Sequence, residues 1–128
     1  MMDPLRNLKN NPLSIINIKN PSEEMQAVAV KGNPFALHLL LQRKIIPSEF
    51  VQLTAVMHTG YALGYLISFD IEVSNTVILT AIQNWPDAIM FVKNPSRIMQ
   101  LTAVKTNPSS YEYIKNPDPL VSEYMKKI

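Results

Sequence analysis

The sequence of 128 residues contains no cysteine, only three glycines and no long apolar run. Without cysteine, disulfides and thiolate metal sites are excluded. The longest apolar stretch, residues 36–41, is interrupted by His38 and falls far short of the roughly 20 residues of a membrane span. We therefore expect no membrane segment.

A strong excess of charge is also missing. The formal net charge is +2, charged residues make up 17% of the chain and hydrophobic residues 47%. A nucleic-acid-binding domain usually concentrates a stronger basic excess, whereas these values are typical of one globular domain covering residues 1–128. The N-terminal segment MMDPLRNLKNNP lacks the apolar core of a secretion signal. We expect a cytoplasmic protein.

Proline, by contrast, is abundant, and most of the ten prolines recur within repeats. The segments MQAVAVK, VQLTAVM, VILTAIQ and MQLTAVK begin at Met25, Val51, Val77 and Met99, at spacings of 26, 26 and 22 residues. Each precedes a second apolar segment: NPFALHLL, TGYALGYL, NWPDAIMFV or NPSSYEYI. This periodicity predicts stacked two-helix repeats of about 22–26 residues each.

The Asn-Pro steps predict where these helices begin. In KNPSEEM, Asn20 is expected to cap the helix, with Pro21 in the first helical position and Glu23 in the third. The same step ends the preceding helix, because the residue before proline avoids the helical region. In NWPDAIMFV we interpret Trp85 as one extra residue before the proline.

Helices this short are marginal in water unless they stack. Small residues at one phase of each helix would let neighbouring backbones approach: Ala29, Ala55, Ala81 and Ala103 in the first helix, and Ser14, Ala36, Ala62, Ala88 and Ser110 in the second. The prediction is an all-α fold, a short α-solenoid of four full units between two half-units. The first half-unit has its first helix clipped to about residues 5–9, and the last lacks a second helix.

Two joints between units are longer than the others. LQRKII precedes Pro47 and ISFDIE precedes Val73, four residues more than elsewhere, which predicts one extra helical turn in each second helix. Residues 42–46 and 68–72 form either a lengthened helix pair that buries its own apolar residues or an apolar ridge that binds a partner. The predicted partner-binding residues are Arg43, Lys44, Ile45, Phe69 and Ile71, together with the aromatic anchors Tyr61 and Trp85.

The segments KNPSEEMQAVAVKGNPFAL and KNPSRIMQLTAVKTNPSSYEYIKNP resemble a helical repeat family of unknown function, with a consensus close to IKNPSEEVQLAAVKQNPYAIQYI. The resemblance covers nearly the whole chain, although the units at Pro47 and Val73 depart from it. Such repeats occur in phages, giant DNA viruses and some intracellular bacteria. The resemblance implies a viral or phage protein in the host cell cytoplasm, and it transfers no catalytic residues.

Several functions remain open at this point. The first is a non-enzymatic protein–protein interaction module that blocks or scaffolds a host or viral protein. The second is nucleic-acid binding through two lysine columns at helix ends, Lys9, Lys31 and Lys105, and Lys19, Lys93 and Lys115. These lysines would equally complement helix dipoles. The third is self-assembly into a homo-oligomer through the half-units.

The other aromatic residues divide between anchoring a partner and packing between repeats: Phe35, Tyr65, Phe91, Tyr111, Tyr113 and Tyr124. The two histidines, His38 and His58, lie beside packing positions without the spacing of a metal site. No nucleophile elbow or glycine-rich phosphate loop is present. We therefore expect no enzymatic activity, no cofactor and no metal.

Overall fold

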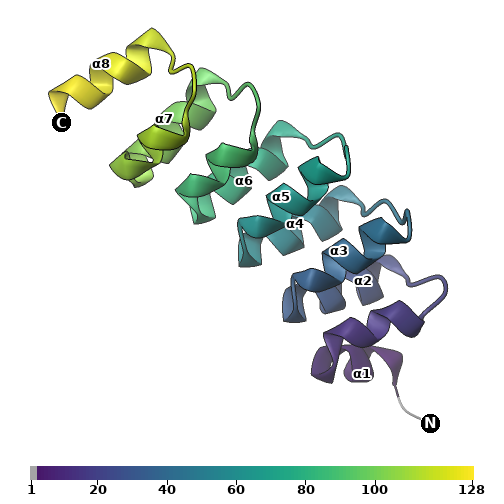
Figure 1. Cartoon of the computed structure of the whole chain (residues 1–128). Coiled ribbons are helices and arrows are strands. Elements are labelled where there is room, and N and C mark those ends of the chain that lie inside the picture. The colour runs from purple at the N-terminus through teal and green to yellow at the C-terminus, as the bar shows by residue number, and fades with distance from the viewer. Residues whose placement is uncertain (1–2) are drawn as a thin grey trace.

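The computed structural model describes residues 3–128, and the regular structure in that range is entirely helical (Figure 1). Met1 and Met2, the start of the polar N-terminal segment, lie outside it. The first helices of the units are α1 (Pro4–Asn10), α2 (Glu23–Gly32), α4 (Glu49–His58), α6 (Asn75–Asn84), α7 (Arg97–Thr106) and α8 (Pro119–Lys127). The second helices are η1 (Pro12–Asn17), α3 (Phe35–Gln42), α5 (Tyr61–Ser68), η2 (Pro86–Phe91) and η3 (Pro108–Tyr113), where η marks a 3₁₀-helix.

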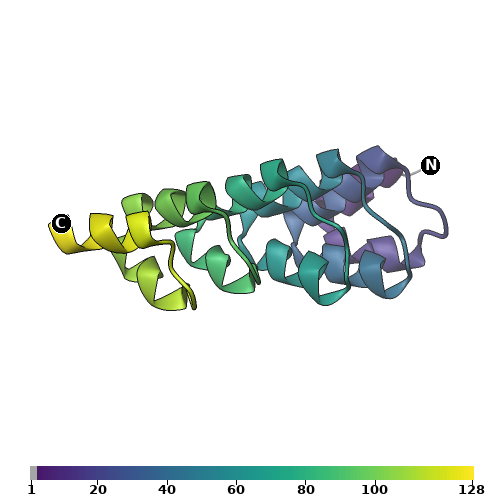
Figure 2. The same cartoon turned by 90° about the horizontal axis from the view of Figure 1, so that it is seen from above.

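The predicted all-α solenoid is confirmed. Each first helix packs against the next first helix, as α2 does against α4 and α4 against α6, and the second helices form a parallel row. Figure 2 shows the two rows from above. The clipped helix α1 has seven residues, and α2 has ten. None of the helices between residues 3 and 128 has the length and apolar content needed to cross a bilayer.

The small-residue columns lie in the core, except for Ser14, which is half-buried. Ala29, Ala55, Ala81 and Ala103 are fully buried in the first row, as are Ala36, Ala62, Ala88 and Ser110 in the second. Larger residues beside them fill the space between rows: Val30, Val56, Ile82 and Val104 are also fully buried. Because the methyl side chains occupy so little space, successive helix backbones approach closely and the larger side chains interdigitate around them.

The N-caps of the first helices differ from the sequence prediction. The cap is a serine, Ser22 and not Asn20 in the first full unit, and the equivalent serine in the next three units. Its Oγ accepts a hydrogen bond from the N–H three residues on, at 3.1–3.3 Å, in Ser22, Ser48, Ser74 and Ser96. The preceding proline is then outside the helix, where its carbonyl accepts a hydrogen bond from a glutamine Nε2 of the same unit: Gln26 to Pro21, Gln52 to Pro47 and Gln100 to Pro95.

The start of the second helices follows the prediction more closely. Asn33 Oδ1 accepts from the N–H of Phe35 at 3.0 Å, and Asn107 Oδ1 accepts from Ser109 at 3.3 Å. Trp85, however, is not an extra residue. Helix α6 ends at Asn84, as α4 ends at His58, and Trp85 takes the asparagine position with the φ of −146° that Asn107 also has. The third full unit therefore has no insertion at this turn.

The two longer units have longer second helices, but by less than the predicted full turn, and the rest of each insertion forms the C-cap and the loop. Helices α3 and α5 have eight residues, whereas η1, η2 and η3 have six. The turn that ends each helix contains a residue with a left-handed backbone conformation: Lys44, with φ 61°, after α3, and Asp70, with φ 58°, after α5. The next N–H then reaches back to the helix, from Ile45 to the Leu40 carbonyl and from Ile71 to that of Leu66, both at 3.0 Å. This is a Schellman C-cap without the usual glycine.

Glycine at these left-handed positions should stabilise the protein. A non-glycine residue there costs about 1–2 kcal/mol, and glycine loses about 0.5–1 kcal/mol of this gain by making the unfolded chain more flexible. We expect Lys44→Gly to raise the free energy of unfolding by about 0.5–1 kcal/mol, and Asp70→Gly by less, because aspartate tolerates this conformation better. Urea unfolding measures both. The control Glu72→Gly, at an exposed loop position with ordinary backbone, should give no gain.

The cap of α8 should respond to acid. Asp118 Oδ1 accepts from the Leu120 N–H at 2.9 Å, and Oδ2 accepts from Arg97 Nε at 3.1 Å. The backbone hydrogen bond from Leu120, followed by Arg97, lowers the pKa of Asp118 below its ordinary value of 3.8. A carboxylate with a lowered folded pKa stabilises the fold above its unfolded pKa, and this stabilisation is lost as the pH falls through the folded pKa.

We therefore expect α8 to fray below about pH 4. Backbone chemical shifts of residues 119–127, followed from pH 6 downward, measure this. Asp118→Asn keeps a capping side chain but cannot titrate, so its α8 should lose most of the acid response. An identical acid response in the two proteins would exclude Asp118 as the cause.

Candidate protein-binding face

Arg43, a predicted partner-binding residue, makes its hydrogen bonds within the fold. Its guanidinium donates hydrogen bonds to three backbone carbonyls at the end of η1: Ile15 at 3.1 Å, Ile18 at 2.7 Å and Lys19 at 2.8 Å. The Ile15 carbonyl also accepts the Ile18 N–H, whereas Arg43 supplies the donor for the Ile18 and Lys19 carbonyls and complements the negative helix end. Arg43 therefore ties α3 to the preceding unit.

The other residues of the predicted ridge are also largely engaged. Ile45, Phe69 and Ile71 are half-buried and pack against the core, whereas Lys44 is exposed. The two insertions thus bury most of their apolar side chains in lengthened helix ends, and Ile46 is the large apolar side chain that they leave exposed. A role of this ridge in binding stays a prediction.

The structure brings aromatic side chains together on the second helices of the central units. We call this surface the aromatic face and define it by seven residues: Phe35, His38, Tyr61, Tyr65, Phe69, Trp85 and Phe91. In one group the centroid of the His38 ring lies 5.0 Å from that of Phe35 and 5.4 Å from those of both Tyr65 and Phe69. In the other group the centroid of the Trp85 ring lies 4.7 Å from that of Tyr61 and 6.3 Å from that of Phe91.

Two glycines of the second central unit make room for these rings. A Cβ atom on Gly60 would lie 2.1 Å from the Trp85 ring, and one on Gly64 would lie 2.9 Å from the Phe91 ring. Any side chain at either position would therefore push an aromatic ring of the next unit outward. The spacing of the repeats does not reveal this contact between neighbouring units, because it depends on where the ring of the next unit lies.

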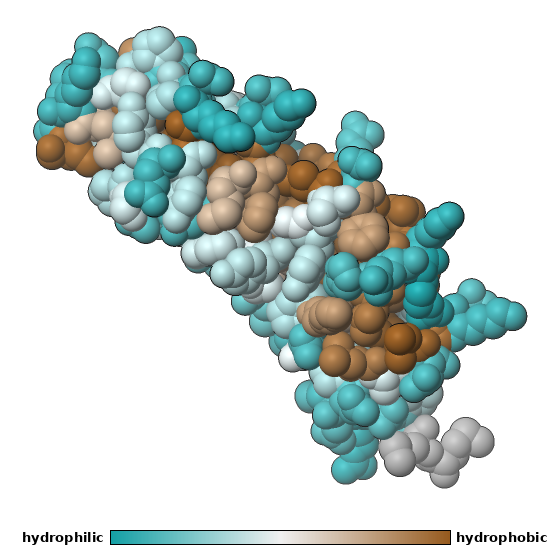
Figure 3. Space-filling model, in the orientation of Figure 1, coloured by the Kyte–Doolittle hydropathy of each residue, from teal (hydrophilic) through white to brown (hydrophobic). Residues whose placement is uncertain are grey.

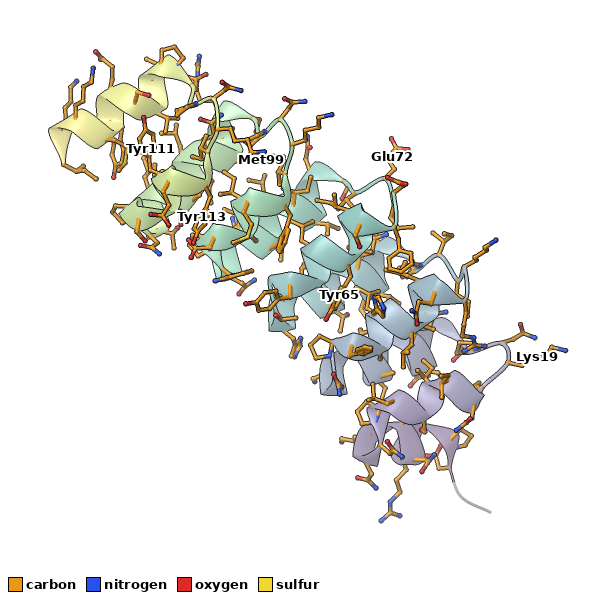
Figure 4. All side chains as sticks on the ribbon, viewed as in Figure 1. Lys19, Tyr65, Glu72, Met99, Tyr111 and Tyr113 are labelled. Atoms are coloured by element: carbon orange, nitrogen blue, oxygen red, sulfur yellow. The ribbon has the colours of Figure 1, made fainter. Side chains whose placement is uncertain are left out.

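Tyr61 stands between two hollows. Its side chain is 60% exposed. The first hollow, of about 320 Å³, is also lined by Met57, His58, Thr59, Gly60, Asn84 and Trp85. The second, of about 350 Å³, is also lined by Gly64, Tyr65, Ile67, Ser68 and Phe91. Figure 3 shows hydrophobic residues exposed over the central part of this face, and Figure 4 shows Tyr65 on the same side of the molecule.

The two predicted lysine columns lie on opposite edges of the stack. Lys9, Lys31 and Lys105 end first helices, whereas Lys19, Lys93 and Lys115 lie in the loops that follow second helices. All six are exposed, and Figure 4 shows Lys19 on the loop edge. Lys93 and Lys115 line one groove of about 600 Å³ with Tyr113, whose pKa is raised by the neighbouring Glu112 and by Asp87. The six lysines therefore do not form a single track for a nucleic-acid backbone.

Within residues 3–128, no group of three or more histidine, cysteine, aspartate or glutamate side chains is placed to hold a metal ion. Comparisons of the chain with family models, curated proteins and solved structures found no significant match. The case for function therefore rests on the geometry of the aromatic face and on the resemblance of the repeats.

Replacing Arg43 should lower stability. Arg43→Ala removes three hydrogen bonds from a charged donor, including those to the Ile18 and Lys19 carbonyls after η1, which we expect to cost about 1–3 kcal/mol in the free energy of unfolding. Urea unfolding measures the change. The neighbouring control Lys44→Ala should alter stability by less than about 0.5 kcal/mol. Equal effects of the two substitutions would show that the guanidinium contacts contribute nothing beyond an exposed charge.

Proposed function

We propose that the chain is a non-enzymatic protein-binding module whose partner docks on the aromatic face. The observation that carries this proposal is the position of Tyr61, which is exposed between two hollows and backed by the Trp85 ring. Tyrosine and tryptophan are enriched among the residues that dominate binding energy at interfaces, especially where a hollow accepts a side chain of the partner.

The scaffold supports such a role. The aromatic residues lie on helices, or on the tight turns between them, and the fully buried alanine columns fix each helix against its neighbours. A binding surface whose side chains are held in place before the partner arrives loses less conformational entropy on binding. Following the resemblance of the repeats, we propose that the partner is a host or viral protein that the module blocks or scaffolds.

A peptide library displayed on phage tests this proposal without knowledge of the natural partner. Selection against the folded chain should enrich ligands that lose at least about tenfold in affinity on Tyr61→Ala, because hot-spot residues typically contribute 2 kcal/mol or more. Phe50→Ala is a matched control, because Phe50 is a similarly exposed aromatic residue, at 57%, on the first helix α4.

The affinity of the selected ligands for Phe50→Ala should equal that for the unmodified chain. Ligands that tolerate Tyr61→Ala but are lost with Phe50→Ala would move the binding surface to the first helices. A selection that enriches no ligand dependent on Tyr61 would overturn the proposal.

A further inference from the structure

The lysine that ends the first helices is missing in two central units. Lys9, Lys31 and Lys105 occupy this position in α1, α2 and α7, whereas α4 has Met57 and α6 has Gln83. A cation in the last turn of a helix complements the negative end of its dipole. Helices α4 and α6 therefore lack the lysine that three other first helices supply.

The part of the chain around these two helices has acidic residues but no lysine or arginine. Residues 45–92 contain no lysine or arginine but include Glu49, Asp70, Glu72 and Asp87, and all twelve lysines and arginines lie outside this range. The central part of the chain is therefore negative, although the whole chain has a net charge of +2. A positively charged partner would be attracted to this part of the molecule and repelled by both ends.

The first hollow beside Tyr61 lies at these helix ends. Met57 and His58 line it from the last turn of α4, and Asn84 lines it from the last residue of α6. The rings of Tyr61 and Trp85 form its aromatic wall, with centroids 4.7 Å apart. Aromatic faces attract cations, and the planar guanidinium of arginine also stacks on them.

An internal parallel shows what a cation does at this position. Where the column keeps its lysine, Lys105 Nζ lies 5.7 Å from the centroid of the Tyr124 ring, which belongs to the following unit. Tyr124 lies on the first helix α8, and its equivalent in α6 is Thr80. In the central units the aromatic rings near this helix end come instead from Tyr61 and Trp85, and the lysine of the column is absent. The hollow thus has two features that favour a cation, helix C-termini and aromatic rings, and no lysine or arginine lining it.

We infer that this hollow receives an arginine side chain of the partner protein. The inference rests on the proposed function and names the chemistry of its central contact. The guanidinium stacks on Tyr61, and its N–H groups point to the C-terminal ends of α4 and α6. Arginine is favoured over lysine because its flat, weakly hydrated group stacks on an aromatic ring at a lower desolvation cost.

The probe for this inference is a short glycine–serine peptide with three arginines. Its control carries citrulline, which has nearly the same shape without the charge. Trp85 is the only tryptophan in the chain, so its indole N–H signal in NMR spectra reports binding at the hollow directly. Titrations at low salt and pH 8, where imidazoles are generally uncharged, give the affinity of each peptide.

Two variants make the test specific. Met57→Lys restores the lysine of the column at a side chain that is 59% exposed, so the fold should be retained while the hollow is filled with a resident cation. Thr76→Lys adds the same charge at an exposed position in the first turn of α6, far from Asn84. Circular dichroism confirms that both variants are folded.

We expect the arginine peptide to shift the indole signal and to bind at least about fivefold more weakly to Met57→Lys, but within about twofold of normal to Thr76→Lys. The citrulline peptide should bind about tenfold more weakly than the arginine peptide. Full affinity of the arginine peptide for Met57→Lys, equal affinity of the two peptides, or an unchanged indole signal would each overturn the inference.

The outcome also separates this inference from the proposed function. If both peptides bind equally and Tyr61→Ala abolishes both interactions, the arginine contact is wrong but the aromatic face still binds peptides. If library selection yields no ligand that depends on Tyr61, the proposed function itself fails.

Discussion

The structure depends on the close contact between helices at the alanine columns. Helices of six to ten residues cannot hold their shape alone in water, so each must gain its stability from its neighbours. A fully buried alanine such as Ala55 or Ala81 lets the next backbone approach, and that approach brings the larger side chains of both rows into contact. A larger residue in either column would separate two units, because a close-packed interior has no space to absorb it.

The N-caps and the loop contacts are a second repeated feature of the stack. The caps and loop contacts repeat because each first helix must start at the same height in the stack: a serine caps the helix, and Gln52 or Gln100 holds the preceding proline carbonyl. In the unit of α6 the proline and the glutamine are replaced together, by Val73 and Ile78. Ile78 has no side-chain donor, so the contact between a glutamine and the preceding loop carbonyl is missing from this unit.

The repeats made most of the fold predictable from the sequence. The helices, the stacking columns and the lengthening of α3 and α5 followed from spacing, because a solenoid translates period directly into packing. The 3₁₀ form of η1, η2 and η3 did not. The cap was assigned to Asn20 instead of Ser22 because both residues are good caps, and spacing alone does not choose between positions two residues apart. The aromatic face was harder to predict. Its clusters join residues of neighbouring units, and the openings at Gly60 and Gly64 depend on where the next ring lies.

The central units depart from the repeat in several ways at once, and this coincidence favours a functional explanation. The second helices α3 and α5 are lengthened, Gly60 and Gly64 lie beneath aromatic rings, Met57 and Gln83 replace the lysine of α4 and α6, and residues 45–92 contain no lysine or arginine. Stacking requires none of these changes, since α7 and η3 form a complete unit without them. Two of them carry a cost, because Lys44 and Asp70 adopt left-handed backbone conformations and α4 and α6 lose a favourable charge at their ends. Lys44 and Asp70 lie on the loop edge that follows the second helices, whereas Met57 lies beside Tyr61 and Trp85 at the aromatic face. A cost to the fold at Met57 is expected if that face binds a partner, because binding can offset what folding loses.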